Sequence, residues 1–207
     1  MKGLFVATSL ATLLAVSACA QAKMYISAEE AKELYGKANV VFVSGDNDDV
    51  YRVGHIKGSV GMDAHHLHHA DIVGHMHCAP LYMCPEEAAE HIGKKGIDND
   101  TYVVAYDDYK GPNASGVYHY FKLYVHEKVS IVNGGMMQLK ALGIPVEKGD
   151  APKITPKHYT VDPKKINWDI LVSKEEVKKA VDDLIANPTG SKYVIIDTRR
   201  MADIIGS

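Results

Sequence analysis

The sequence predicts an α/β fold in which a parallel sheet carries helices on both faces. Four short runs rich in β-branched and aromatic residues have the length of buried strands: residues 40–43, 58–62, 101–106 and 129–132. Four longer stretches have helical character: residues 28–36, 85–95, 113–125 and 135–142. Strands that alternate with helices in this way are typical of parallel sheets covered on both sides, so the order of the segments predicts the architecture.

Local signals predict the ends of several elements. Ser27-Ala28-Glu29-Glu30 has the pattern of a capping box, so a helix is expected to begin there. Pro85, followed by two glutamates, is a good start for another helix, and Gly96 is a good end. Asn133-Gly134-Gly135 predicts a turn that needs positive backbone angles.

Residues 1–22 have the pattern of an export signal, with an apolar centre at 4–16 followed by small residues. Val16-Ser17-Ala18-Cys19 resembles the lipobox of bacterial lipoproteins, which makes Cys19 a candidate for lipidation. Plain cleavage shortly after Cys19 is the alternative. Both interpretations predict an exported protein of the periplasm or outer cell envelope, and lipidation would add membrane attachment through the N-terminus.

The chain begins the same α/β unit twice. Ser173-Lys174-Glu175-Glu176 repeats the capping box, and Tyr193-Val194-Ile195-Ile196 predicts the strand that follows it. Residues 149–168 contain several prolines and few periodic apolar positions, as an interdomain linker does. We therefore expect a first domain at 24–148 and the truncated beginning of a second at 169–207, because one helix and one strand cannot bury a core.

Composition limits the class of function. The chain has 46% hydrophobic residues, a net charge of -3 and no block of basic residues. Binding to phosphate backbones requires clustered lysine and arginine. A globular protein without a nucleic-acid partner is therefore expected.

The loop after the run 101–106 is the most informative feature for chemistry. Its candidate pocket residues are Asp107, Asp108, Tyr109, Lys110, Gly111 and Asn113. A loop between a strand and a helix N-terminus directs backbone N–H groups into a small bowl that favours an anion or a thiolate. Asp107 stands where a reactive cysteine would be expected and fills the bowl with its own charge. The sequence thus predicts the architecture of a reactive site without its nucleophile.

Several segments together resemble the rhodanese, or thiosulfate sulfurtransferase, family in its tandem two-domain form. They are a Gly-His-Ile-Lys-Gly element containing His55 and Gly58, the loop strand 103–107, and residues 114–118, 129–135 and 142–146. The second copy adds Asp197 and Arg199 of an Asp-x-Arg element. In tandem members the first domain commonly carries aspartate at the nucleophile position and the second holds the persulfide-forming cysteine. The resemblance therefore implies that any active cysteine lies beyond Ser207.

The chain also departs from the family pattern. Ser44 and Asp46 stand where the family's aspartate and arginine usually stand, so the ion pairing of those two residues is expected to be absent. Lys57 replaces the usual proline. These changes suit a structural or regulatory half better than a catalytic one.

The activity that the resemblance implies is transfer of sulfane sulfur from thiosulfate to a thiol or cyanide acceptor. A cysteine thiolate of low pKa would take the sulfur as a persulfide and pass it on, with no cofactor required. Residues 1–207 hold no convincing candidate for that thiolate, so this chain alone is expected to be inactive.

A histidine-rich insert is the second candidate site. Its candidate metal ligands are His65, His66, His68, His69, His75, His77, Cys78 and Cys84. Imidazole and thiolate ligands together suit Cu or Zn, which makes a non-catalytic, exported metal-binding or sensor lipoprotein the alternative function. The insert has two other interpretations. It could be a solvated loop in which Cys78 and Cys84 form a disulfide, or its histidines could frame the pocket mouth with His55 and bind an anion.

Overall fold

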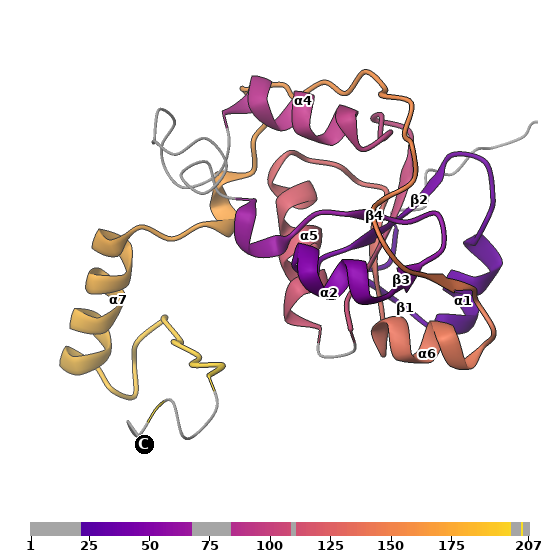
Figure 1. Ribbon diagram of the computed structural model, residues 1–207. Helices are drawn as coiled ribbons and strands as arrows, with labels where there is room; N and C mark the ends of the chain where they lie inside the picture. The colour runs from indigo at the N-terminus through magenta and orange to yellow at the C-terminus, as the bar shows by residue number, and fades with distance from the viewer. Residues whose placement is uncertain (1–21, 68–83, 109–110, 200–203, 205–207) are drawn as a thin grey trace, which may run out of the picture.

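The computed structural model describes residues 22–67, 84–108, 111–199 and 204, and at its centre lies a five-stranded parallel sheet (Figure 1). The strand order is β1-β6-β5-β2-β4, and every neighbouring pair runs parallel. The strands are β1 (Tyr25–Ile26), β2 (Val40–Ser44), β4 (Val60–Gly61), β5 (Tyr102–Tyr106) and β6 (Val129–Val132).

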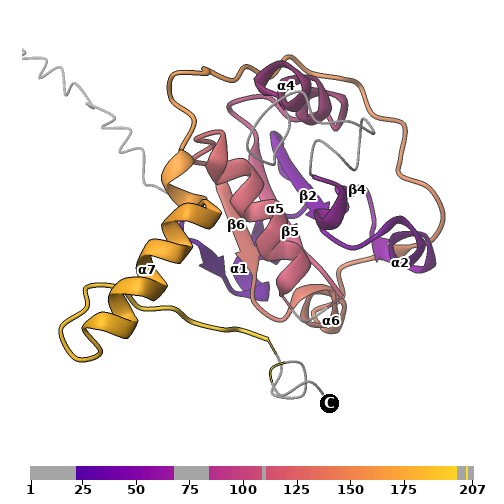
Figure 2. The same ribbon diagram turned by 90° about the vertical axis from the view of Figure 1, so that its left-hand side faces the viewer.

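Helices cover both faces of this sheet. α4 (Pro85–Lys94) and α5 (Pro112–Leu123) contribute to one apolar cluster, while α1 (Ala28–Leu34) and α6 (Gly135–Ala141) contribute to the other. Alternate residues of β5 divide between them, with Val103 and Ala105 in the first cluster and Val104 and Tyr106 in the second. Figure 2 shows α5 lying across its face of the sheet. The predicted α/β architecture is confirmed.

The predicted helix ends agree with the structure. Ser27 Oγ accepts the Glu30 N–H at 3.2 Å, and the Glu30 carboxylate accepts the Ser27 N–H at 2.9 Å, which completes the capping box of α1. α4 begins at Pro85, and Gly96 follows its end with a φ of +74°. These helix ends could be predicted because caps are formed by residues that are neighbours in the sequence.

Several short elements were not predicted. A small antiparallel sheet pairs β3 (His55–Ile56) with β7 (Val146–Glu147), and β1 adds an edge to the main sheet. α2 (Asp48–Val53) follows β2 and is capped by Asn47, whose side chain accepts the Val50 N–H at 2.9 Å. Two-residue strands and a helix of one and a half turns are too short to show a periodic pattern of apolar residues.

Residues 149–171, which we call the strap, pass over α4 on their way to the C-terminal part of the chain (Figures 1 and 2). The strap includes the short helix η2 (Trp168–Ile170). Tyr159 is 3% exposed and belongs to the same apolar cluster as α4 and α5. The strap backbone lies so close to Gly93 that a Cβ there would come within 2.4 Å of the Lys157 carbonyl oxygen. The segment expected as a linker is therefore packed on the domain.

α7 (Lys174–Ala186) starts at the second predicted capping box, where Ser173 Oγ accepts the Glu176 N–H at 3.2 Å. The strand expected at 193–196 is not formed, and that prediction is wrong for this structure. Val194 is 82% exposed, and no strand among the described residues pairs with the run. A strand is held by its ladder, so β propensity alone does not create one.

Within the described ranges, none of the helices combines the length and apolar character that a membrane crossing requires.

Candidate functional site

Asp107 follows β5 directly and occupies the bowl that the loop forms. Its side chain is 1% exposed. Oδ1 accepts the N–H of Gly111 at 3.1 Å, and Oδ2 accepts the N–H of Ala114 at 3.1 Å. Gly111, with φ of 93°, is the N-cap of α5, so the carboxylate sits at the N-terminus of that helix. Both carboxylate oxygens are thus engaged by backbone amides, where an anionic group is favoured.

A second carboxylate, that of Asp46, lies beside the same loop. Asn113 Nδ2 donates to Asp46 Oδ1 at 3.1 Å, and Ser44 Oγ donates to Oδ2 at 3.2 Å. Burial raises the pKa of Asp46, and the charges of Asp107 and Asp108 act in the same direction. These contacts replace the ion pair that the family's residues at 44 and 46 would make. The loop residues Tyr109 and Lys110 lie outside the described residues.

The family-motif histidine is a structural group in this chain. His55 is 1% exposed, its Nδ1 donates to the Tyr51 carbonyl at 2.9 Å, and its ring stacks on that of Tyr51 at 3.9 Å. Its Nε2 lies 3.5 Å from Glu147 Oε1, across the small sheet. His55 therefore fixes α2 against β7, and the structure does not place it at a pocket mouth.

Lys57 and Gly58 form the turn after His55. Gly58 has φ of +79°, and its N–H donates to Glu147 Oε1 at 2.8 Å. The backbone N–H of Lys57 donates to the Pro145 carbonyl at 2.8 Å. A proline at position 57 could not make this bond, so the departure from the family pattern has a structural consequence.

Two tyrosines that the sequence analysis did not assign hold the segment around the motif, Tyr106 from the sheet and Tyr51 from α2. The hydroxyl of Tyr106, the last residue of β5, accepts the Ile56 N–H at 3.0 Å and lies 2.7 Å from Ser59 Oγ. The Tyr51 hydroxyl donates to the Ser59 carbonyl at 2.7 Å. Burial raises the pKa of Tyr51 to about 12, and it raises the pKa of Tyr106 as well. Both hydroxyls therefore stay protonated at neutral pH. No sequence pattern distinguishes such tyrosines from other core aromatics.

The motif residues of the second copy are separate from the loop. Arg199 Nη2 lies 2.6 Å from Asp197 Oδ2, and Arg199 Nε donates to Asp197 Oδ1 at 3.0 Å. The two side chains pair with each other on an exposed segment, with no further ion pair among the described residues.

Only part of the proposed metal site falls within the described residues. η1 (Ala64–His66) carries His65, which is exposed, and His66, whose Nδ1 lies 3.3 Å from Asp63 Oδ2. Cys84 is disulfide-bonded. Across the described residues, no three His, Cys, Asp or Glu side chains come together as a metal-binding group. The other candidate ligands, His68, His69, His75, His77 and Cys78, lie outside the described residues.

The disulfide of Cys84 is the alternative that the sequence offered to metal ligation. Of the other two cysteines, Cys78 is the expected partner, and both it and Cys19 lie outside the described residues. A cysteine held in a disulfide does not act as a thiolate ligand or nucleophile.

The loop at Asp107 has the scaffold for holding an anion but no thiol. Residues 107–113 contain no cysteine. A carboxylate held by backbone amides cannot accept a sulfane sulfur as a persulfide. The loop is therefore a filled site in this domain.

Relatives of this chain include sulfurtransferases. It is 30% identical over 131 residues to a putative thiosulfate sulfurtransferase of Mycobacterium leprae, covering 61% of this chain and 44% of the relative. It is 30% identical over 134 residues to a probable 3-mercaptopyruvate sulfurtransferase of Schizosaccharomyces pombe, covering 63% of this chain and 43% of that protein. The chain thus spans less than half the length of these curated relatives.

The fold is shared with solved structures. The crystal structure of SseA from Escherichia coli, a 3-mercaptopyruvate sulfotransferase, aligns with a TM-score of 0.62 at 20% identity, covering 88% of this chain and 68% of that one. An anaerobic ergothioneine biosynthesis enzyme from Chlorobium limicola aligns with a TM-score of 0.60 at 22% identity, over 77% of this chain and 41% of that one. At these identities the likeness shows the fold.

The family model of the rhodanese-like domain matches residues 27–142, which is more than half of the chain. The match runs from the cap of α1 through α6 and includes the Asp107 loop. This chain therefore belongs to the rhodanese-like domain family.

Proposed function

We propose that the chain is the supporting rhodanese-like half of an exported sulfurtransferase, and that the persulfide-forming cysteine lies in a second domain beyond residue 207. The observation that carries the proposal is the Asp107 carboxylate, buried and held by two loop amides at the family's nucleophile position. The coverage of less than half of the curated relatives supports a longer protein.

The proposed chemistry is a double displacement. The cysteine thiolate attacks the outer sulfur of thiosulfate, the S–S bond of thiosulfate breaks, and sulfite leaves with the electron pair. A thiol acceptor in its thiolate form, or cyanide, then attacks the outer sulfur of the persulfide and releases the cysteine thiolate. No oxidant, reductant or cofactor is needed. The first domain contributes the packed scaffold, because its own loop is filled by Asp107.

The test compares thiosulfate:cyanide sulfurtransferase activity of the complete reading frame with that of the 207-residue chain. Activity only in the longer protein is expected, together with a persulfide on a cysteine beyond residue 207 detected by mass spectrometry. Asp107→Ala in the longer protein is the matched variant, and it should retain the persulfide. Activity in the 207-residue chain, or a longer protein without a loop cysteine, would overturn the proposal.

Export and lipid attachment belong to the same proposal and have their own measurement. Mass spectrometry of the mature protein should find an N-terminus at Cys19 carrying lipid, and Cys19→Ala should abolish the lipid. A mature N-terminus shortly after Cys19, without lipid, would support plain cleavage instead. An intact Met1 would contradict export altogether.

A further inference from the structure

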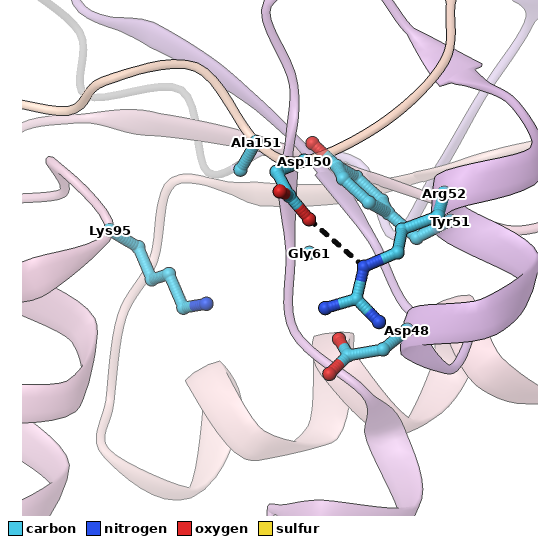
Figure 3. A pocket seen from close by; sticks show the side chains of 7 residues that line it. All are labelled: Asp48, Tyr51, Arg52, Gly61, Lys95, Asp150 and Ala151. Carbon is cyan, nitrogen blue, oxygen red and sulfur yellow. Dashed lines mark hydrogen bonds and ion pairs between the residues drawn. The ribbon is translucent and has the colours of Figure 1, made fainter.

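A small cavity of about 160 Å³ lies among α2, β4 and the end of α4 (Figure 3). None of the described residues of the Asp107 loop lines it. Its charged side chains are those of Asp48, Arg52, Lys95 and Asp150. A neighbouring cavity of about 180 Å³ shares Asp48, Gly61 and Lys95 with it, so the two lie side by side, and we call them together the groove.

Lys95 is the cation of this groove that lacks a close counter-charge. It follows the last residue of α4 and is half-buried, and its side-chain ammonium makes no hydrogen bond or ion pair among the described residues. Burial lowers its pKa, and Asp48 is the acid whose charge opposes that effect. The preceding residue behaves differently, because Lys94 is exposed and pairs with Glu90 at 2.6 Å.

Arg52 faces Lys95 from the other side of the cavity. Its Nε donates to Asp150 Oδ1 at 2.9 Å. In Figure 3 the terminal nitrogens of Arg52 and the Lys95 ammonium point into the same space from opposite walls, with the Asp48 carboxylate beside the guanidinium. Three carboxylates, those of Asp150, Asp48 and Asp49, therefore raise the pKa of Arg52, while Asp48 is the one acid that raises the pKa of Lys95.

His91, which lines the neighbouring cavity, adds little charge at neutral pH. Burial lowers the pKa of His91 to about 4, with the charges of Lys95 and Lys94 acting in the same direction. His66 also lines that cavity, and its Nδ1 lies 3.3 Å from Oδ2 of Asp63, a further acid of the lining. The positive charge available to a bound group thus comes from Lys95 and from the free end of Arg52.

We propose that this groove binds a small oxyanion, with the Lys95 ammonium and the terminal guanidinium nitrogens of Arg52 as its donors. Oxyanions and carboxylates accept charge-assisted hydrogen bonds from such groups. The cavity admits a small anion between the two cations. The site is independent of sulfur transfer at a cysteine, so it can be tested on the 207-residue chain.

Isothermal titration calorimetry with sodium sulfate and, separately, sodium acetate at constant ionic strength tests the site, while NMR follows the Gly61 amide. Saturable binding of at least one anion is expected, with a shift of the Gly61 resonance. Lys95→Met keeps the aliphatic stem and should weaken binding about tenfold, the effect of one charge-assisted hydrogen bond. The matched control Lys94→Met should change affinity by less than about twofold.

The two anions distinguish the geometry of the ligand. Tighter binding of sulfate indicates a tetrahedral oxyanion, and tighter binding of acetate indicates a carboxylate. If Lys95→Met fails to fold, Arg52→Gln on the exposed wall should give a comparable loss. Equal effects of Lys95→Met and Lys94→Met, or no saturable binding of either anion, would overturn the proposal.

Discussion

The Asp107 carboxylate accepts hydrogen bonds from two backbone amides that would otherwise be left without partners at the start of α5. It therefore acts as a cap for that helix as well as an occupant of the bowl. The same side chain stands close enough to Asp46 to raise the pKa of that carboxyl. Removing it should consequently change both the stability of the loop and the titration of its neighbour.

We predict that Asp107→Ala lowers the free energy of unfolding by about 2 kcal/mol, because the buried N–H of Ala114 and the part-buried N–H of Gly111 lose a charged acceptor. Urea denaturation of the two proteins measures the difference. Asp169→Ala is the control, since Asp169 is exposed and makes no ion pair among the described residues. The pKa of Asp46, followed by NMR, should fall in Asp107→Ala. An unchanged stability would contradict the capping role.

Lys57 gives a second prediction at this scale. Its backbone N–H donates to the Pro145 carbonyl, and its side chain is exposed. Lys57→Pro restores the residue usual in the family but removes the donor, so it should be roughly 1–3 kcal/mol less stable than Lys57→Ala. Thermal or urea unfolding of both variants tests this. Equal stability would mean that the bond contributes nothing.

The positions and contacts of the residues at the two sites could be predicted from the sequence only in part. Asp107 was found because its position is fixed by a strand on one side and a helix start on the other, both visible in the sequence. The Tyr106 hydroxyl and the Lys95 cavity were not found. Their partners come from segments distant in the chain, and no local pattern records such contacts.

At the scale of elements, long strands and helices were predictable and short ones were not. β2, β5 and β6 are buried on both faces, so each is a continuous apolar run. The strap, in contrast, could not be predicted to pack on the core. Ile154 and Tyr159 pack on the core from an extended segment whose apolar residues have no regular spacing. These two positions are recognised as buried only when the surface of α4 and α5 on which they pack is known.

An ion pair attaches the strap to the domain and predicts a pH dependence. Lys157 Nζ lies 2.9 Å from Asp98 Oδ2, and this contact, with the Thr101 hydroxyl, lowers the pKa of Asp98 to about 2 from its ordinary 3.8. Because the folded-state pKa lies below the unfolded one, the stabilisation is complete above pH 3.8 and is lost as the pH falls toward 2.

The variant Asp98→Asn isolates this contribution. Its deficit in unfolding free energy relative to the unaltered protein should be constant at neutral pH and should shrink between pH 4 and pH 2. Denaturant titrations at several pH values measure it. Lys128 forms an exposed pair with Asp100 at 2.9 Å, so Asp100→Asn is the control and should show little such dependence. A deficit in Asp98→Asn that stays constant to pH 2 would rule out the ion pair as its cause.

At the scale of the whole molecule, the apolar core extends beyond the segment that the sequence suggested as the first domain. Residues packed against the cluster of α4 and α5 continue through the strap to Leu171. Asn167 also donates its N–H to the Leu123 carbonyl at 2.8 Å, at the end of α5. Beyond residue 171, Val172 and Ile185 are 65% and 74% exposed, so α7 adds little to this core.

Two shortened chains test which residues form the cooperative unit. A chain of residues 22–172 should unfold within about 0.5 kcal/mol of one of residues 22–207, because it keeps the strap and loses mainly exposed surface. A chain of residues 22–148 should be far less stable. Loss of one buried aromatic such as Tyr159 costs about 3–5 kcal/mol, a large part of the 5–15 kcal/mol typical of a domain. Urea denaturation and amide hydrogen exchange at β6 measure both effects. If residues 22–148 proved as stable as residues 22–172, the strap would be a linker after all, and its contacts with α4 would contribute nothing to folding.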